Sequence, residues 1–483
     1  MAKRFITRTG EWPDQPRKAK EIIKLLDEGE LTPRTEVFDE AAQDWRPLTE
    51  VEPFAEHLRR EEELRQTLSP EEFAKRKKFR RPVRYVLTGL GIIIVFVAVA
   101  FAMATLFESF AEGLGGLPEA PSGDAEPLWR FAVGEAVGGS PCYYDGVVYF
   151  GSQDGSVYCV DAVSGEGLWR YDTGGPIIGE VLVVDGRVYV GSCANGVWCL
   201  DSATGERLWT FYTGFYVGGG VHFSDGRLYF GCYDHNVYCV DAVDGEEVWR
   251  FKTGDWVFAT PFVAGGRVFV GSYDDHLYCL EADTGREIWR YEVGGDIKSS
   301  PYVWRDKVYF GADDSRLYCL EADSAEPELL WRFRDPELWN YIRSRIVVFD
   351  GRVFFGSLNN QIYAVDALTG ELLWRHKTTN TVEAGGLVAG ELADGREFAV
   401  GHSHRRPTVD RPEDIEPRSA YLYIGSANNS LYCLDVADGS LAWFYATQGH
   451  VLTDPDFHDG VVYFGSQDGH LYAVRSYPEL EAD

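Results

Sequence analysis

The stretch LYCLEADTGREIW, from Leu277 to Trp289, recurs along the chain in imperfect copies. Each copy ends in a tryptophan; the first five are spaced 40 residues apart and the later steps are wider: Trp129, Trp169, Trp209, Trp249, Trp289, Trp331, Trp374 and Trp443. Each period also places Asp-Gly or similar turns between stretches that alternate aromatic and β-branched residues, which is a hairpin signal. A period of about 40 residues with four strands predicts a β-propeller blade.

The two ends of the repeat region indicate how the ring closes. The segment Leu128–Phe131 comes before any complete unit, whereas the last unit stops at Val474 without a tryptophan strand. The first strand is therefore expected to complete the last blade, which removes exposed sheet edges. We predict an all-β, eight-bladed β-propeller with four-stranded blades and three-plus-one closure over residues 126–477, followed by a tail at residues 478–483.

Several copies resemble the tryptophan-docking motif of PQQ-like propellers, among them VDAVSGEGLW at Val160–Trp169 and VDALTGELLW at Val365–Trp374. In that family the tryptophan packs against the motif of the neighbouring blade, so that the tryptophans form a girdle around the ring. The resemblance assigns this structural role to Trp129, Trp169, Trp209, Trp249, Trp289, Trp331, Trp374 and Trp443. It predicts the fold, whereas function has to be argued from a site.

A second feature is the uncharged stretch at residues 85–107. Its 23 residues are long enough to cross the hydrocarbon core as one transmembrane helix. The linker before it, residues 57–84, is expected to be helical and has seven Lys and Arg residues between Lys75 and Arg84. The linker after it, residues 108–125, contains Asp and Glu but no Lys or Arg. The positive-inside rule therefore predicts a single-pass protein of the inner membrane with a cytoplasmic N-terminus and a periplasmic propeller.

The charge balance supports two compartments. Residues 1–84 carry 19 Lys and Arg against 18 Asp and Glu, and the rest of the chain carries 27 against 58. So acidic a surface repels phosphate, which makes nucleic acid an unsuitable partner. Residues 1–56, with a strand expected at Thr35–Phe38 and the run DWRPL at Asp44–Leu48, resemble a small α+β GYF-like domain. The resemblance implies a cytoplasmic partner for this domain.

Residue types that carry catalysis or bind cofactors are sparse. Six of the nine cysteines occupy one repeated strand position, too far apart to form disulfides, and are expected to pack between blades: Cys159, Cys199, Cys239, Cys279, Cys319 and Cys433. No two cysteines are adjacent and no C-x-x-C-H motif is present, whereas quinoprotein alcohol dehydrogenases use a vicinal cysteine pair and often a haem. We therefore assign no catalytic residue, no cofactor and no metal ligand.

Aligning the blades on the glycine of VYFGS exposes one candidate site. Fourteen residues earlier each aligned blade has a Val or Ile, which is expected to pack. Its neighbours should face the other way on a strand that lines the central channel. They form a candidate partner-binding set at the channel mouth: Tyr216, Trp256, Phe258, Lys298, Tyr341, Arg343, Arg345 and His450. Aromatic residues and Arg are typical of binding hot spots, although large side chains could also simply plug a wide channel.

These features favour a membrane-anchored, non-catalytic binding or scaffold protein of the cell envelope, whose propeller engages a protein or peptide. Two alternatives remain open. One is a transmembrane sensor that binds a small ligand at the propeller mouth, and the other is a PQQ-dependent oxidoreductase.

Overall fold

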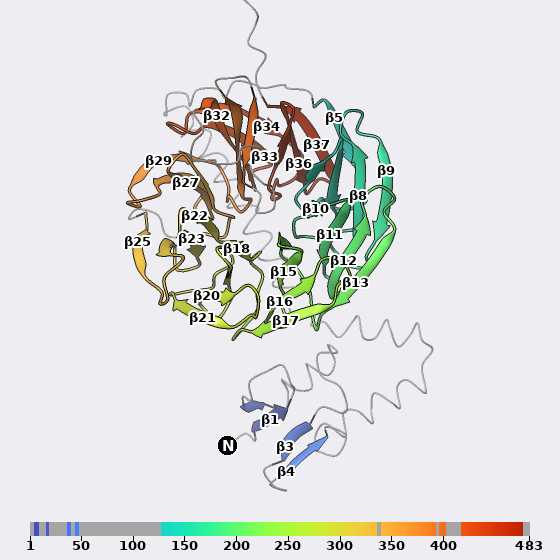
Figure 1. Cartoon of the computed structure of the whole chain (residues 1–483), viewed down its shortest axis with the longest axis vertical. Helices are drawn as coiled ribbons and strands as arrows, with labels where there is room; N and C mark the ends of the chain where they lie inside the picture. The colour runs from blue at the N-terminus through green and yellow to red at the C-terminus, as the bar shows by residue number, and fades with distance from the viewer. Residues whose placement is uncertain are drawn as a thin grey trace, which may run out of the picture. The chain divides into compact units, whose positions relative to one another are not determined.

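The computed structural model describes residues 4–8, 16–18, 36–39, 44–47, 127–335, 340–392, 396–401 and 417–476 (Figure 1). The chain divides into two compact units, Met1–Glu119 and Ala120–Asp483. The predicted boundaries at residues 56, 84, 107 and 125, and the predicted membrane helix, lie outside the described residues. No helix in the described part of the chain is long and apolar enough to span a membrane.

The described residues of the first unit form an antiparallel sheet. Its strands are β1 (Arg4–Arg8), β2 (Pro16–Lys18), β3 (Glu36–Asp39) and β4 (Asp44–Pro47), in the order β2-β1-β3-β4. Strand β3 coincides within one residue with the strand expected at Thr35–Phe38, and β4 covers most of the DWRPL run. The likeness to a GYF domain stays a prediction.

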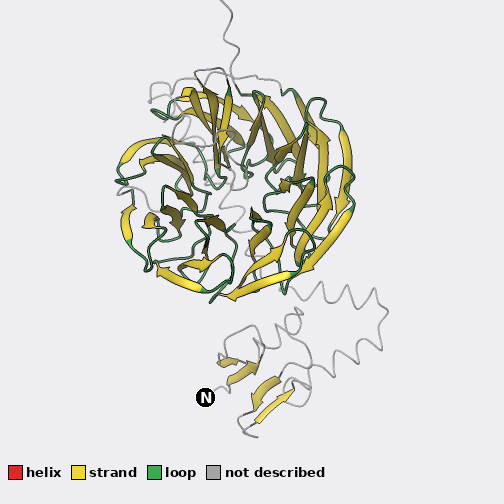
Figure 2. Cartoon of the chain, in the orientation of Figure 1, coloured by secondary structure: helices red, strands yellow, loops and turns green. Residues whose placement is uncertain are grey.

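The second unit is a ring of eight antiparallel sheets, which we number as blades one to eight in chain order (Figures 1 and 2). Blade one consists of β6 (Cys142–Tyr144), β7 (Val147–Gly151), β8 (Ser156–Asp161) and β9 (Gly167–Asp172). Blade two consists of β10 (Leu182–Val184), β11 (Arg187–Ser192), β12 (Gly196–Asp201) and β13 (Arg207–Tyr212). Blade three consists of β14 (His222–Ser224), β15 (Arg227–Gly231), β16 (Asn236–Asp241) and β17 (Glu247–Lys252). Blade four consists of β18 (Phe262–Ala264), β19 (Arg267–Gly271), β20 (His276–Glu281) and β21 (Glu287–Glu292). Blade five consists of β22 (Tyr302–Trp304), β23 (Lys307–Ala312), β24 (Arg316–Glu321) and β25 (Leu329–Phe333). Blade six consists of β26 (Val347–Phe349), β27 (Arg352–Ser357), β28 (Gln361–Asp366) and β29 (Leu372–Lys377).

Blades seven and eight differ from the others. Blade seven has five strands in the order β31-β30-β32-β33-β34: β30 (Gly386–Leu392), β31 (Glu397–Val400), β32 (Pro417–Ser426), β33 (Ser430–Asp435) and β34 (Leu441–Ala446). Blade eight combines β35 (Asp456–His458), β36 (Val461–Ser466) and β37 (His470–Arg475) with β5 (Trp129–Ala132), which pairs with β37. The predicted eight-bladed, three-plus-one propeller is confirmed, with one additional strand in blade seven.

The hairpin turns follow from local sequence. In blade one, Tyr144 pairs with Val147, which leaves Asp145 and Gly146 as a two-residue turn. Both have positive φ, 48° and 84°, the left-handed conformation that tight hairpins require and that Asp-Gly tolerates. The same geometry recurs at Asp185-Gly186 in blade two.

Neighbouring blades are joined by the repeated tryptophans. Trp249 of blade three donates its indole N–H to the carbonyl of Ala282 in blade four at 2.9 Å. Gly285 of the same turn has φ of 69°, and a Cβ there would lie 2.6 Å from the Trp249 ring. The indole N–H of every repeated tryptophan bonds the next blade in this way: Trp129, Trp169, Trp209, Trp249, Trp289, Trp331, Trp374 and Trp443.

A second interblade contact lies nearer the axis. Val257 packs on Gly231 of the preceding blade so closely that a Cβ on this glycine would lie 2.4 Å from the Val257 side chain. The equivalent contacts run around the ring through Val137, Ile177, Val217, Val257, Ile297, Ile342, Val382 and Val451, all buried. Aligning the blades with one another identified seven of these residues. It missed Val382, because the added strand of blade seven lengthens the distance in sequence from Val382 to the glycine Gly425.

All nine cysteines lie in the described part of the chain without a disulfide, and eight of them are buried. Each of the six repeated ones pairs in strand register with the tryptophan of its own blade, as Cys239 does with Trp249. Burial raises the pKa of Cys279 to about 12 and that of Cys199 to about 11. These thiols are therefore protonated packing groups.

Candidate functional site

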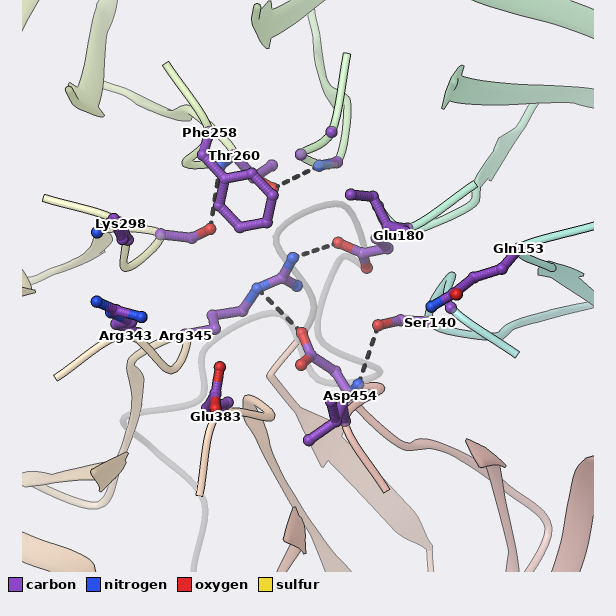
Figure 3. A pocket seen from close by; sticks show the side chains of 18 of the residues that line it. Ser140, Gln153, Glu180, Phe258, Thr260, Lys298, Arg343, Arg345, Glu383 and Asp454 are labelled. Atoms are coloured by element: carbon purple, nitrogen blue, oxygen red, sulfur yellow. Dashed lines mark hydrogen bonds and ion pairs between the residues drawn. The ribbon is translucent and has the colours of Figure 1, made fainter. Parts of the chain in front are cut away.

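A four-residue block recurs in every blade, in the loop that leads into β6, β10, β14, β18, β22, β26, β30 and β35. It begins with the buried Val or Ile, and its second and fourth residues line a cavity of about 370 Å³ in the central channel (Figure 3). The lining residues at the second position are Gly138, Ile178, Gly218, Phe258, Lys298, Arg343, Glu383 and Leu452. Those at the fourth are Ser140, Glu180, Gly220, Thr260, Ser300, Arg345 and Asp454. The cavity thus receives side chains from all eight blades.

Hydrogen bonds between fourth-position residues connect adjacent blades. The Gly220 amide donates to Thr260 Oγ1 at 2.9 Å, and the Thr260 amide donates to Ser300 Oγ at 3.0 Å. On the other side of the ring, the Asp454 amide donates to Ser140 Oγ at 2.9 Å (Figure 3). Each of these hydrogen bonds joins two neighbouring blades. Together they help to hold the walls of the cavity in place.

Arg345 is the central charge of the cavity. Its Nη2 lies 2.5 Å from Oε2 of Glu180, and its Nε lies 3.3 Å from Oδ2 of Asp454, so that blades two, six and eight meet at one guanidinium (Figure 3). Arg345 is 9 % exposed. Burial alone would lower its pKa, but the charges of Glu180 and Asp454 outweigh burial and hold the pKa above the usual range. The guanidinium is therefore permanently charged.

A second group of charges lies beside it on blades five and six. Lys298 Nζ contacts Asp313 Oδ2 at 2.7 Å and Asp296 Oδ2 at 2.8 Å. Arg343 forms a two-bond pair with the same Asp313, at 2.9 and 2.8 Å. The Lys298 ammonium also lies 4.6 Å from the centre of the Tyr273 ring. Two cations thus share Asp313, and Asp296 balances the second.

An aromatic wall covers blades three and four. Tyr233, Tyr273 and Phe258 line the cavity. Trp256 lies outside it and meets Tyr233 edge to face, with ring centres 5.0 Å apart. Burial raises the pKa of both tyrosines, so their hydroxyls stay protonated.

The rim of the cavity is formed by the residues directly before each block. Tyr216, Trp256 and Tyr341 are 41, 43 and 42 % exposed and do not line the cavity. Tyr341 holds the Arg343 guanidinium 4.7 Å from its ring centre. His450 is exposed at the same position in blade eight, and its Nδ1 lies 3.0 Å from Asn429 Oδ1.

The candidate set from the sequence therefore divides in two. Phe258, Lys298, Arg343 and Arg345 line the cavity, whereas Tyr216, Trp256, Tyr341 and His450 lie on the rim. The sequence argument placed all eight on the innermost strands, which is wrong, because these strands are three residues long and begin after the blocks. In a loop, strict alternation of side chains does not hold.

Several lining residues were missed from the sequence, namely Glu180, Tyr233, Tyr273, Gln153 and Gln467. The last four stand two residues after the glycine of VYFGS, and Glu180 stands at the fourth position of its block. Both positions vary from blade to blade, which is the signal that could have identified them.

The site offers little for metal or quinone chemistry. The described residues include no group of three or more His, Cys, Asp or Glu able to hold a metal ion. His402 and His404, the only histidines close together in sequence, lie outside the described residues. The cavity arginines and lysine are already paired with carboxylates, so they do not fit a quinone that carries several carboxylates of its own.

Comparison with known proteins agrees with this repeat architecture. The family described as outer membrane protein assembly factor BamB matches residues 120–215, 213–277, 264–347, 323–404 and 418–476. The chain belongs to this family. The BamB structure from Moraxella catarrhalis superposes with a TM-score of 0.56 at 17 % identity, covering 74 % of this chain and 99 % of that one. This likeness extends to the fold alone.

Two further proteins are similar to this chain, one of them designed and the other an enzyme. The computationally designed protein Ika8 superposes with a TM-score of 0.58 at 16 % identity, covering 71 % of this chain and 97 % of the designed one. Tetrathionate hydrolase from Acidithiobacillus ferrooxidans is 27 % identical over 138 residues, which is 27 % of this chain. The match spans only 26 % of the hydrolase. A part of this chain is therefore similar to a part of an enzyme.

Proposed function

We propose that the protein is a membrane-anchored, non-catalytic scaffold of the cell envelope whose propeller binds a protein or peptide outside the inner membrane. The observation that supports this most is the aromatic set Tyr216, Trp256 and Tyr341, each more than 40 % exposed and close in sequence to residues that line the cavity. Large exposed aromatic side chains beside Arg are typical of binding hot spots. Membership of a family named for an assembly factor also favours a protein partner.

The repeat itself provides a second argument. Positions that serve the fold are alike in every blade, as the girdle tryptophans and the Val or Ile column are. The rim position differs between blades, with Tyr216, Trp256, Tyr341 and His450 at equivalent places. Because each blade meets the same packing problem, side chains that vary in this way are free to serve something outside the ring.

Replacing Trp256 with Ala should weaken binding of the partner by about 2 kcal/mol or more, as hot-spot truncations do. The melting temperature should change little, since the side chain is 43 % exposed and lies outside the girdle. The partner is first identified by photo-crosslinking from position 256 in intact membranes. Its dissociation constant is then measured with the purified full chain and with the variant.

The matched control is Tyr212→Ala, since Tyr212 is 68 % exposed on the outermost strand β13, away from the mouth. This variant should bind the partner as the unchanged chain does. Equal losses of affinity in the two variants, or none in Trp256→Ala, would exclude the rim as the binding surface.

The anchoring and topology rest on residues 75–107. Seven basic residues on the N-terminal side of the uncharged stretch favour a cytoplasmic N-terminus. Protease added to spheroplasts should therefore digest the propeller and leave residues 1–84 intact, as followed with antibodies to each part. Permeabilised cells serve as the control, in which both parts are digested. Protection of the propeller in intact spheroplasts would reverse the proposed topology.

The sensor alternative draws support from the cavity itself, because about 370 Å³ is within the range of small-molecule sites. The oxidoreductase alternative has less support, since no two cysteines are adjacent and the cavity cations are paired.

A further inference from the structure

The cavity contains a buried donor that lacks an acceptor. Nη1 of Arg345 has no hydrogen-bond partner within the part of the chain that the structure describes, and the side chain is 8 % exposed. A buried donor without a partner costs free energy, more so when it is charged. The described residues therefore supply no acceptor for this N–H group, and a ligand oxygen could do so.

Two side-chain amides also line the cavity. Gln153 of blade one and Gln467 of blade eight both line the cavity. Their backbone N–H groups are used, donating to Ala136 and His450 at 2.8 Å, but their side-chain amides form no hydrogen bond with the described residues. Each free amide offers two donors and one acceptor. Together with Arg345 they can bind several hydroxyl groups.

The charges of the cavity disfavour a charged occupant. Arg345 is engaged by Glu180 and Asp454, while Lys298 and Arg343 share Asp313. An anion would have to displace one of these carboxylates or lie beside them unpaired, which is costly in a buried site. A cation would meet the fixed charge of Arg345, and the remaining lining carboxylate, Glu383, already interacts with the charge of Arg343. A neutral, hydroxyl-rich ligand avoids both costs.

The aromatic wall adds a shape requirement. Tyr233 and Phe258 line the cavity with flat aromatic rings, whereas one face of the Tyr273 ring carries the Lys298 ammonium. A sugar ring has hydroxyl groups around its edge and a face of C–H groups that can lie on such surfaces. We infer that the central cavity binds a neutral saccharide of one or two rings, with its apolar face on the aromatic wall and its hydroxyls bonded to Arg345, Gln153 and Gln467. A volume of about 370 Å³ lies at the small end of ligand pockets, as such a ligand requires.

The test uses the purified full chain in a detergent whose head group is not a sugar. Glucose, galactose, mannose, N-acetylglucosamine, cellobiose and chitobiose are titrated by calorimetry and by tryptophan fluorescence, since Trp256 contacts Tyr233 of the wall. At least one should bind saturably with a dissociation constant of about 1 mM or tighter. Glucuronate and protonated glucosamine, which carry one charge each, should bind at least about ten-fold more weakly, as an unpaired charge in a buried site requires.

Variants then locate the site. Gln153→Ala and Phe258→Ala should each weaken binding at least about five-fold, the equivalent of one lost hydrogen bond or stacking contact. Gln448→Ala is the matched control, because Gln448 is exposed and does not line the cavity, and its affinity should be unchanged. Melting temperatures establish that every variant is folded. The assignment is wrong if no neutral sugar binds, so that the cavity holds only water, if a charged sugar binds best, or if both cavity variants bind normally.

Discussion

Replacing Trp249 with Ala is expected to lower the free energy of unfolding of the propeller by about 3 to 5 kcal/mol. The side chain is 8 % exposed, and its indole N–H bonds Ala282 of the next blade at 2.9 Å. Removing the indole leaves a cavity beneath the Gly285 turn and takes the shortest of three hydrogen bonds from the Ala282 carbonyl, which keeps Tyr229 Oη at 3.3 Å and Arg227 Nη1 at 3.4 Å. Chemical denaturation followed by tryptophan fluorescence of the remaining residues measures the change.

The exposed Trp256 provides the control for this prediction. Both changes remove an indole, but Trp256 is 43 % exposed and its ring packs on Tyr233 and Tyr273. Trp256→Ala should therefore cost much less stability than Trp249→Ala. Comparable losses would mean that the rim residue, and not only the girdle, is required to close the ring, and the separation between structural and binding tryptophans would fail.

Replacing Arg345 with Met should also cost about 3 to 5 kcal/mol of unfolding free energy. Glu180 and Asp454 would then stand near one another in the cavity without the guanidinium that now lies 2.5 and 3.3 Å away. Removing one partner of a buried charge cluster leaves uncompensated charge, which costs more than the net value of the pair. Adding Glu180→Gln to Arg345→Met should restore part of the stability, because one of the two orphaned charges is gone.

Arg343 offers a matched comparison two residues away. Its side chain is 29 % exposed, and its partner Asp313 keeps Lys298 when Arg343 is removed. Arg343→Met should therefore cost only about 1 kcal/mol or less. Chemical denaturation measures the stability of both variants. Equal losses of stability would show that the contacts of Arg345 with Glu180 and Asp454 stabilise the propeller no more than the contact of Arg343 with Asp313 does.

The architecture was predictable because it repeats. The repeated tryptophan, 40 residues apart in the first five copies, the Asp-Gly or similar turn and the glycine of VYFGS recur with little change, and eight copies of a weak signal make a strong one. Closure by Trp129–Ala132 was predictable because the first unit has a strand too many and the last one too few. The extra strand β31 was not predicted, since Glu397–Val400 has no counterpart in the other blades.

The site depended on the tertiary structure. The sequence indicated which positions vary, and so brought Phe258, Lys298, Arg343 and Arg345 into view. It gave no sign that Arg345 meets Glu180, which is 165 residues away, or that Asp454 joins them, because each of these charges occurs once and matches no repeat. Only the closing of the ring brings blades two, six and eight to one axis. Interactions that repeat are therefore encoded locally, whereas the contacts across the channel exist only after all eight blades have assembled.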